Sequence, residues 1–193
     1  MRRALALILV SVVAAACGSS GDAASQTTEG KKYVDALMKS YNASQAKKSI
    51  TATEARCISE ASIDELGVST LKKAKTAPSD LDHGSGFATL AKNLSKSDVA
   101  RASAAIVDAN CLNPGEVLMR TGVAKAKAFA KIPEAKVRCI FVKLGTSSAA
   151  RKAFADSLLG LAQGETEFSE AFRNKPKFLS AGADCGVAKK LLE

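Results

Sequence analysis

The stretch "TATEARCISEASIDELG", residues 51–67, carries signals for both ends of one helix. Thr51 and Glu54 have the spacing of a capping box, in which each side chain accepts a hydrogen bond from the backbone N–H of the other residue. Gly67 is of the residue type found most often just after a helix C-terminus. The segment also contains Cys57, one of five cysteines in the chain. We therefore predict a helix over residues 51–67 and interpret the rest of the fold outward from it.

Comparable helix signals occur on both sides of this segment. Apolar residues recur at three- and four-residue spacing, Ser95 stands where an N-cap is expected, and Pro114 stands where a first turn tolerates proline. Only "VRCIFVKL" (137–144) has the composition of a strand, and because no second strand candidate exists to pair with it, we predict a buried helix there. The predicted fold class is all-α, a helical bundle. Its predicted segments are 31–49, 51–67, the start of 68–87, 94–111, 113–132, 133–145, 147–164, 165–174 and 177–193.

The composition agrees with a helical core and excludes one class of partner. Hydrophobic residues make up 47% of the 193 residues, with no Trp and two Tyr, and alanine supplies many of them. Such a core is typical of packed helices rather than of an aromatic-rich β-sandwich. The net charge of +9 is spread along the chain, with no run of five basic residues and no aromatic residues interleaved with basic ones. We expect no nucleic-acid partner, whereas an anionic polymer remains a candidate.

The first 21 residues have the parts of an export signal. Arg2 and Arg3 precede an apolar run, residues 4–16, which as a helix of about 20 Å is too short for the roughly 30 Å hydrocarbon core of a bilayer. The run ends in three alanines followed by Cys17. A basic start, a short apolar core and small residues before a cleavage point are typical of secretory signals. An ordinary signal peptide with a chance cysteine, or an N-terminal core helix, are the alternatives.

Small residues followed by cysteine at the end of a short apolar segment resemble the bacterial lipobox. The resemblance implies cleavage before Cys17, a thioether bond from Cys17 to diacylglycerol, and further acylation by a chain such as palmitate. Two or three acyl chains give stable membrane binding. We therefore predict a signal peptide over 1–16 and a flexible, polar tether over 17–32, which lifts the helical domain, 33–193, off the membrane. The predicted location is the extracytoplasmic face of the cell membrane.

Setting Cys17 aside leaves four cysteines, an even number in a chain expected to be exported. Such cysteines form disulfides by default. Structural zinc prefers closely spaced pairs, and neither these nor a redox C-x-x-C motif occurs here. Four cysteines allow three pairings, and their positions alone do not select one. The candidate disulfide residues are Cys57, Cys111, Cys139 and Cys185.

An internal similarity favours one of the three pairings. "ARCI" (55–58) recurs as "VRCI" (137–140), and each is followed by Leu-Gly. "ANCLNPGEVL" (109–118) recurs as "ADCGVAKKLL" (183–192). We interpret the chain as two related helical units, 50–132 and 133–193, each closed by its own disulfide, Cys57–Cys111 and Cys139–Cys185. Chance similarity between short alanine-rich helices is the alternative.

No pattern in the chain predicts catalytic residues, metal ligands or a cofactor site. His83, the only histidine, lies in "SDLDHGSGF" (79–87), which begins like a calcium loop but has Gly84, Ser85 and Ala91 where an EF-hand needs an oxygen ligand, Gly and Glu. We expect His83 to be an exposed loop residue rather than a catalytic base, although Asp80, Asp82 and Ser85 lie near it in sequence. Adjacent or alternate carboxylates diverge on a helix. Such pairs are Asp64 with Glu65 and Glu165 with Glu167.

The whole pattern, a lipobox followed by four spaced cysteines on alanine-rich helices, resembles a class of small actinobacterial lipoproteins of unassigned function. The resemblance implies a helical fold and an envelope location, and no known chemistry. We predict a protein that is not an enzyme and works as a helical binding module, held to membrane lipid through Cys17. Its expected partner is an envelope protein or an anionic polymer. A carrier of a small apolar ligand or lipid is the main alternative, and an enzyme is the third.

Overall fold

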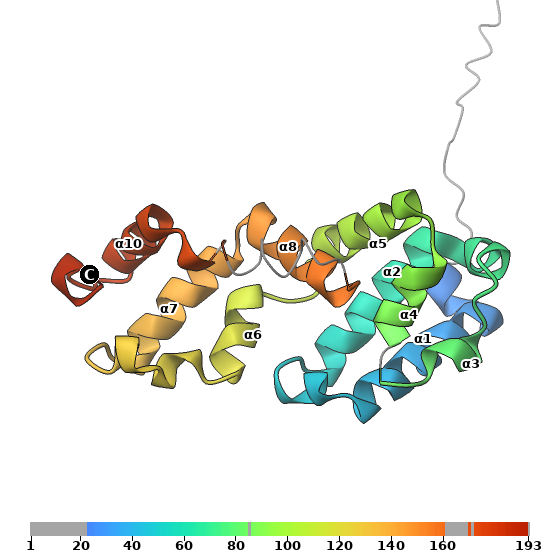
Figure 1. The fold of residues 1–193 in the computed structure, drawn as a ribbon, viewed down its shortest axis with the longest axis horizontal. Helices are drawn as coiled ribbons and strands as arrows, with labels where there is room; N and C mark the ends of the chain where they lie inside the picture. The colour runs from blue at the N-terminus through green and yellow to red at the C-terminus, as the bar shows by residue number, and fades with distance from the viewer. Residues whose placement is uncertain (1–22, 85, 161–169, 171, 193) are drawn as a thin grey trace, which may run out of the picture.

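A computed structural model of the chain describes residues 23–84, 86–160, 170 and 172–192 (Figure 1). These residues form helices and no strand, which confirms the all-α prediction. The α-helices are α1 (Thr28–Ala43), α2 (Ala52–Lys73), α3 (Pro78–Leu81), α4 (Gly86–Asn93), α5 (Lys96–Asp108), α6 (Pro114–Arg120), α7 (Glu134–Gly145), α8 (Ser148–Leu158) and α10 (Lys175–Asp184). Short 3₁₀ helices are η1 (Ala24–Gln26), η2 (Gln45–Lys48), η3 (Val123–Lys125), η4 (Lys127–Phe129) and η5 (Lys189–Leu191).

The local signals in the sequence mark real helix ends. The Thr51 hydroxyl accepts a hydrogen bond from the Glu54 backbone N–H at 3.2 Å, and the Glu54 carboxylate accepts one from the Thr51 backbone N–H at 2.7 Å. Ser95 caps α5 and Pro114 occupies the first turn of α6, both as predicted. At Gly67 the backbone leaves the helical conformation (φ 68°, ψ 148°), and it then resumes a helix to Lys73. The predicted break is therefore confirmed, and the segment "VRCIFVKL" is helical as expected.

Several predicted boundaries were wrong. The tether was predicted to extend to residue 32, but η1 and the start of α1 already occupy residues 24–32, where the Ser25 backbone N–H donates to Asp64 of α2 at 2.6 Å. The helix predicted over 113–132 ends at Arg120, because Gly122 adopts a left-handed conformation with φ 85°. The helix predicted over 177–193 ends at Asp184, just before the positive φ of Gly186.

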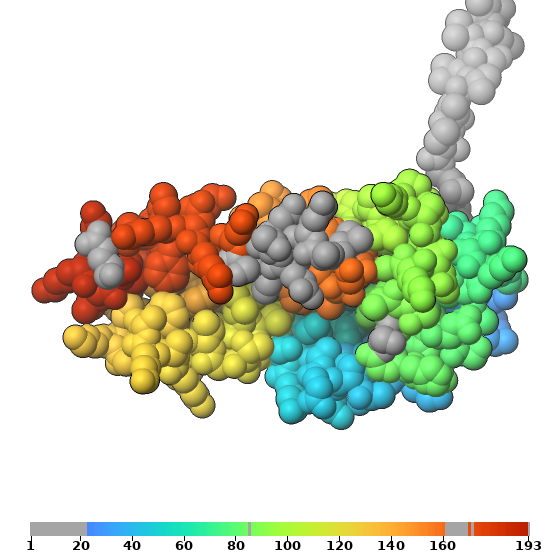
Figure 2. All heavy atoms as spheres, in the orientation of Figure 1, coloured from blue at the N-terminus to red at the C-terminus, as the bar shows by residue number. Residues whose placement is uncertain are grey.

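The helices pack into two bundles that lie end to end in one elongated body (Figures 1 and 2). The N-terminal bundle consists of η1, η2, α1 to α5 and α8, and the C-terminal bundle consists of α6, η3, η4, α7, α10 and η5. α8 follows α7 in sequence but packs against α5. Val117 of α6 lies in the core of the N-terminal bundle, and Ala150 of α8 lies in that of the C-terminal bundle. The two bundles therefore share a joint made by α6 and α8.

This arrangement differs from the predicted units 50–132 and 133–193. That boundary separates α6 from α7, although these two helices pack closely together. It also assigns α8 to the second unit, whereas α8 covers α5. The helices that match between the bundles are α2 with α7 and α5 with α10. α2 packs against α1, whereas α7 packs against α6. Sequence similarity located the cysteine-bearing helices but not the helices that pack beside them.

Both predicted disulfides are present. Cys57 of α2 is bonded to Cys111, which follows α5, with a Cα–Cα distance of 5.4 Å. Cys139 of α7 is bonded to Cys185, the C-cap residue of α10, with a Cα–Cα distance of 5.9 Å. Each bond links a residue just after the end of one helix to a residue within a neighbouring helix of the same bundle. The pairing favoured by the internal similarity is therefore confirmed.

The two bundles have different cores. The N-terminal core is mainly aliphatic, although Tyr33, Tyr41 and Phe154 are also buried in it, and fully buried leucines and isoleucines from α1, α2, α3 and α4 meet there. The C-terminal core contains a cluster of four phenylalanine rings whose neighbouring centroids are 5.6 to 6.1 Å apart. These rings come from segments distant in sequence and give the smaller bundle a large apolar area per residue. They are Phe129, Phe141, Phe172 and Phe178.

An ion pair ties the N-terminus of α2 to the C-terminus of α6 at the joint. The Arg120 guanidinium donates to both Glu54 carboxylate oxygens at 2.6 and 2.8 Å, and also to the Ser49 carbonyl at 2.7 Å. Burial on its own raises the pKa of Glu54, but hydrogen bonds from Arg120 and Thr51 outweigh it, so the pKa lies below its ordinary value of 4.5. A carboxyl with a lowered pKa stabilises the fold above its unfolded pKa, and this contribution is lost as the pH falls through the folded pKa.

Glu54→Gln is therefore expected to cost about 2 kcal/mol at neutral pH and to make stability less sensitive to acid below pH about 4.5. Urea denaturation of both proteins across the acid range measures this. Glu29→Gln is the matched control, because the ion pair of Glu29 with Lys72 is well exposed on both sides and such pairs contribute little. Equal acid sensitivity of the Glu54 variant and the parent protein would contradict the assignment.

Candidate functional site

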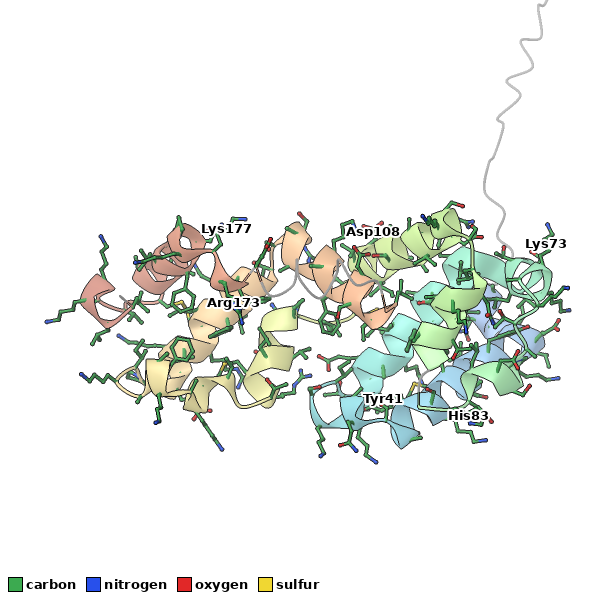
Figure 3. All side chains as sticks on the ribbon, in the orientation of Figure 1. Tyr41, Lys73, His83, Asp108, Arg173 and Lys177 are labelled. Atoms are coloured by element: carbon green, nitrogen blue, oxygen red, sulfur yellow. A yellow bond between two sulfur atoms is a disulfide. The ribbon has the colours of Figure 1, made fainter. Side chains whose placement is uncertain are left out.

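The loop that contains His83 does not assemble catalytic groups among the described residues. The His83 side chain is 81% exposed, and its Nδ1 lies 3.2 Å from Asp82. Asp82 is paired with Lys39 at 2.6 Å, and this hydrogen bond lowers the pKa of the Asp82 carboxyl. Asp80 instead accepts a hydrogen bond from the Ala77 backbone N–H at the start of α3. His83 therefore lies on the outside of the N-terminal bundle, as predicted (Figure 3).

The candidate carboxylate pairs also diverge where the structure describes them. Asp64 accepts from the Ser25 backbone, whereas Glu65 accepts from Arg101 at 2.7 Å on α5. In the described ranges no group of three His, Cys, Asp or Glu side chains is arranged to hold a metal ion. Four residues singled out in the sequence lie outside the described residues, as do the predicted signal peptide and lipobox. They are Cys17, Ser85, Glu165 and Glu167.

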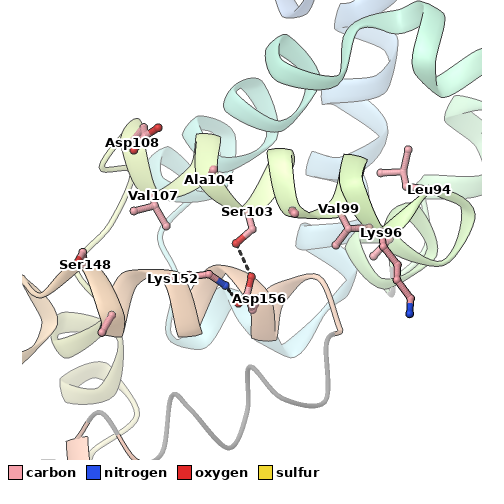
Figure 4. A pocket seen from close by; sticks show the side chains of 13 residues that line it. Leu94, Lys96, Val99, Ser103, Ala104, Val107, Asp108, Ser148, Lys152 and Asp156 are labelled. Atoms are coloured by element: carbon pink, nitrogen blue, oxygen red, sulfur yellow. Dashed lines mark hydrogen bonds and ion pairs between the residues drawn. The ribbon is translucent and has the colours of Figure 1, made fainter.

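A groove between α5 and α8 is the candidate binding site. It has a volume of about 720 Å³, within the range typical of ligand sites, and it is open to solvent along one side. Small and apolar side chains form most of its walls (Figure 4). On α5 and the turn before it these are Leu94, Val99, Ala100, Ala104 and Val107, with Ala91 from α4 and Ala149 from α8.

One carboxylate is buried in the wall of this groove. Asp156 of α8 has a side chain only 8% exposed, and it is the one charged side chain in the buried core of the described residues. The Ser103 hydroxyl donates to one of its oxygens at 2.5 Å, and the Lys152 ammonium pairs with the other. A buried charge is costly unless it is paired and hydrogen-bonded, and both conditions hold here. The Lys152 head group remains exposed and faces the groove (Figure 4).

The ends of the groove carry opposite charges. Lys96 and Asp108 both line it, and they lie at opposite ends of α5 (Figure 4). Twelve residues of helix separate them, which corresponds to about 18 Å. An elongated occupant with an apolar face and polar ends matches this layout, whereas a buried catalytic centre does not. The groove is therefore taken as the candidate binding site.

No pattern noted in the sequence predicted the groove. Val99, Ala102 and Ile106 are buried on the core face of α5, and a second stripe of the helix lies beside them at positions 96, 100, 103, 104 and 107. That second stripe is a detectable signal, because a helix with small residues next to its core face presents a wide apolar surface. The partner that turns this surface into a groove is α8, which lies about 50 residues later in the chain.

In the described parts of the chain, no helix is both long enough and apolar enough to cross a bilayer. The groove is lined by side chains of α4, α5 and α8 and of the turn between α4 and α5, all of which lie in the N-terminal bundle. In comparisons with protein-family models, curated proteins and solved structures, no match to the chain was found.

Proposed function

We propose that the protein is a membrane-anchored bacterial lipoprotein whose helical domain works by binding, with the groove between α5 and α8 receiving an apolar segment of an envelope protein. The observation that carries this proposal is the groove itself. Its walls are built from small side chains, and its charged groups lie at the rim or in an internally satisfied pair. Such a surface gains free energy mainly from excluding water between apolar groups.

Two further features support an exported, anchored protein. Both disulfides belong to the described fold, and disulfides persist mainly in extracytoplasmic compartments. The first helix of the described residues, η1, begins at Ala24, seven residues after Cys17. An acylated Cys17 is therefore proposed as the anchor, with residues 1–16 as the signal peptide.

The mass of the mature protein tests the anchor. We expect the mass of residues 17–193 with two or three acyl chains added and four hydrogens removed for the two disulfides. The control is the Cys17→Ser variant, which is expected to lose the acyl mass and to leave the membrane fraction. An unmodified Cys17 in the membrane-purified protein would overturn the proposed anchor but would leave the groove unaffected.

Site-specific photo-crosslinking in cells tests the groove. A photoreactive residue at Ala104 or Ala149, both exposed in the groove, is expected to trap the same partner protein, identified by mass spectrometry. The same probe at Ala43, exposed at the end of α1 and outside the groove, is the matched control. Ala100→Trp fills the groove and is expected to abolish the crosslink from Ala149. Equal crosslinking from Ala43 would contradict the proposal.

The groove volume also favours a second candidate function, the transport of a small apolar molecule or lipid. A volume of about 720 Å³ is sufficient for a drug-sized ligand. Extraction of the purified protein with organic solvent, followed by mass spectrometry, separates the two candidates. Recovery of a single lipid species from the parent protein, and its absence from Ala100→Trp, would favour the carrier function over the binding of a protein partner.

A further inference from the structure

Exposed lysines gather at the end of the C-terminal bundle that lies furthest from α1. The two segments 123–138 and 185–192 meet there, because the Lys136 ammonium donates to the Gly186 carbonyl at 2.5 Å and Cys139 is bonded to Cys185. Figure 3 shows nitrogen-tipped side chains projecting from this end. We call this surface the lysine end, and it consists of Lys125, Lys127, Lys131, Lys136, Lys189 and Lys190, all exposed.

The lysine end has little compensating negative charge. Among the described residues of these two segments, Glu134 is the only carboxylate. No described carboxylate forms an ion pair with Lys125, Lys127, Lys131 or Lys190. Four lysines elsewhere in the described residues do form ion pairs with carboxylates, namely Lys39, Lys72, Lys143 and Lys152. Four of the six lysines lie within residues 125–136, and the fold brings Lys189 and Lys190 to the same end of the molecule, which makes a strongly positive surface.

An exposed leucine lies within this positive surface. Leu191 is 38% exposed and is the one large hydrophobic residue classed as exposed among the described residues. Its neighbour Leu192 packs over Gly182, where an added Cβ would lie 2.2 Å from the leucine Cδ1. Leu191 follows Lys189 and Lys190 directly in η5. Basic residues next to an exposed apolar side chain are the combination that binds a membrane interface.

We propose that the lysine end docks on anionic phospholipid headgroups, with Leu191 entering the membrane interface. This proposal rests on the proposed anchoring at Cys17. The stretch from Cys17 to residue 23 reaches at most about 20 Å, so the N-terminal bundle stays near the bilayer. The lysine end lies at the opposite end of the molecule from η1 (Figure 1). With the anchor at one end and the lysine end at the other, the protein lies along the membrane instead of being lifted off it. A lipid anchor and a basic patch together give the two signals that stable membrane binding requires.

Vesicle co-sedimentation tests this independently of the anchor. The chain without residues 1–16 and with Cys17→Ser is expected to bind phosphatidylcholine vesicles that contain about one third phosphatidylglycerol, and to bind pure phosphatidylcholine much more weakly. A quadruple variant is expected to weaken vesicle binding at least about tenfold. It replaces Lys125, Lys127, Lys189 and Lys190 with Gln. The matched control changes Lys31, Lys47, Lys48 and Lys73 to Gln, which removes equal charge from exposed positions of the N-terminal bundle.

Three outcomes would overturn the proposal. The first is an equal loss of binding in both quadruple variants, and the second is binding that does not depend on phosphatidylglycerol. The third is that Leu191→Ser leaves vesicle binding unchanged while the protein is retained by polyglycerol phosphate. That third outcome would indicate an anionic polymer as the partner. Circular dichroism confirms that each variant is folded. Because the tested chain has no acyl group and an intact groove, failure here leaves the proposed anchor and the proposed partner site standing.

Discussion

Replacing Cys139 and Cys185 together by alanine is expected to unfold the C-terminal bundle while the N-terminal bundle stays folded. In the chain-entropy model a disulfide that closes a loop of this size contributes about 4 kcal/mol. The two cysteines are 46 residues apart and clamp α7 to α10. A bundle of this size rarely has more than about 3 to 5 kcal/mol of stability from its core alone. Losing the bond therefore removes nearly all of that stability.

Hydrogen exchange resolved by peptide measures this expectation. Amides of α7 and α10 are expected to lose protection, whereas those of α1 and α2 keep it. The matched control replaces Cys57 and Cys111, whose separation of 54 residues is similar. There the larger core, shared by six α-helices, is expected to keep the bundle folded, although at a lower melting temperature. Retained protection of α10 in the first variant would contradict the argument.

Gly115→Ala is expected to destabilise the protein by about 3 kcal/mol, at the upper end of the effects of overpacking. A Cβ at position 115 would lie 1.9 Å from the Phe141 carbonyl oxygen, which is an impossible contact with backbone. α6 and α7 approach this closely because Asn113 connects them. The side-chain NH₂ group of Asn113 donates to the Val142 carbonyl at 3.0 Å, and the side-chain oxygen of Asn113 accepts from the Gly115 backbone N–H at 2.8 Å. The alanine variant must separate two helices that these bonds hold together.

Denaturant titration of Gly115→Ala against the parent protein measures the cost. Gly84→Ala is the control, since an added Cβ there meets nothing closer than 4.0 Å and Gly84 is exposed. That variant is expected to change stability by less than about 0.5 kcal/mol. A similar loss in both variants would mean that the close approach of α6 to α7 does not limit the fold.

Local features of the sequence predicted helices well because their signals act over a few residues. The capping box at Thr51 and Glu54, the N-cap at Ser95 and the break at Gly67 depend only on neighbouring backbone groups. One boundary was wrong because a contact from elsewhere decided it. The predicted tether was too long, because η1 is held by Asp64 of α2, far along the chain.

The candidate site depended on information that is not local. Ser103 and Asp156 are 53 residues apart, and neither is distinctive in its own segment. Their hydrogen bond exists because α8 packs mainly on α5 and only slightly on α7, the helix before it. The lysine end is similar in part, since four of its lysines lie within residues 125–136 but Lys189 and Lys190 come from a segment about 50 residues later.

The sequence by itself determined the helical class, most helix starts and, through the repeated cysteine segments, the two disulfide pairs. These follow from hydrogen-bonding and spacing rules that hold within a single helix. The tertiary structure alone decided that α6 joins α7, that α8 covers α5, and that a groove and a lysine end result. An amphipathic helix shows which of its faces is apolar, but the helix that covers this face is selected by shape and close approach between distant segments, as at Gly115.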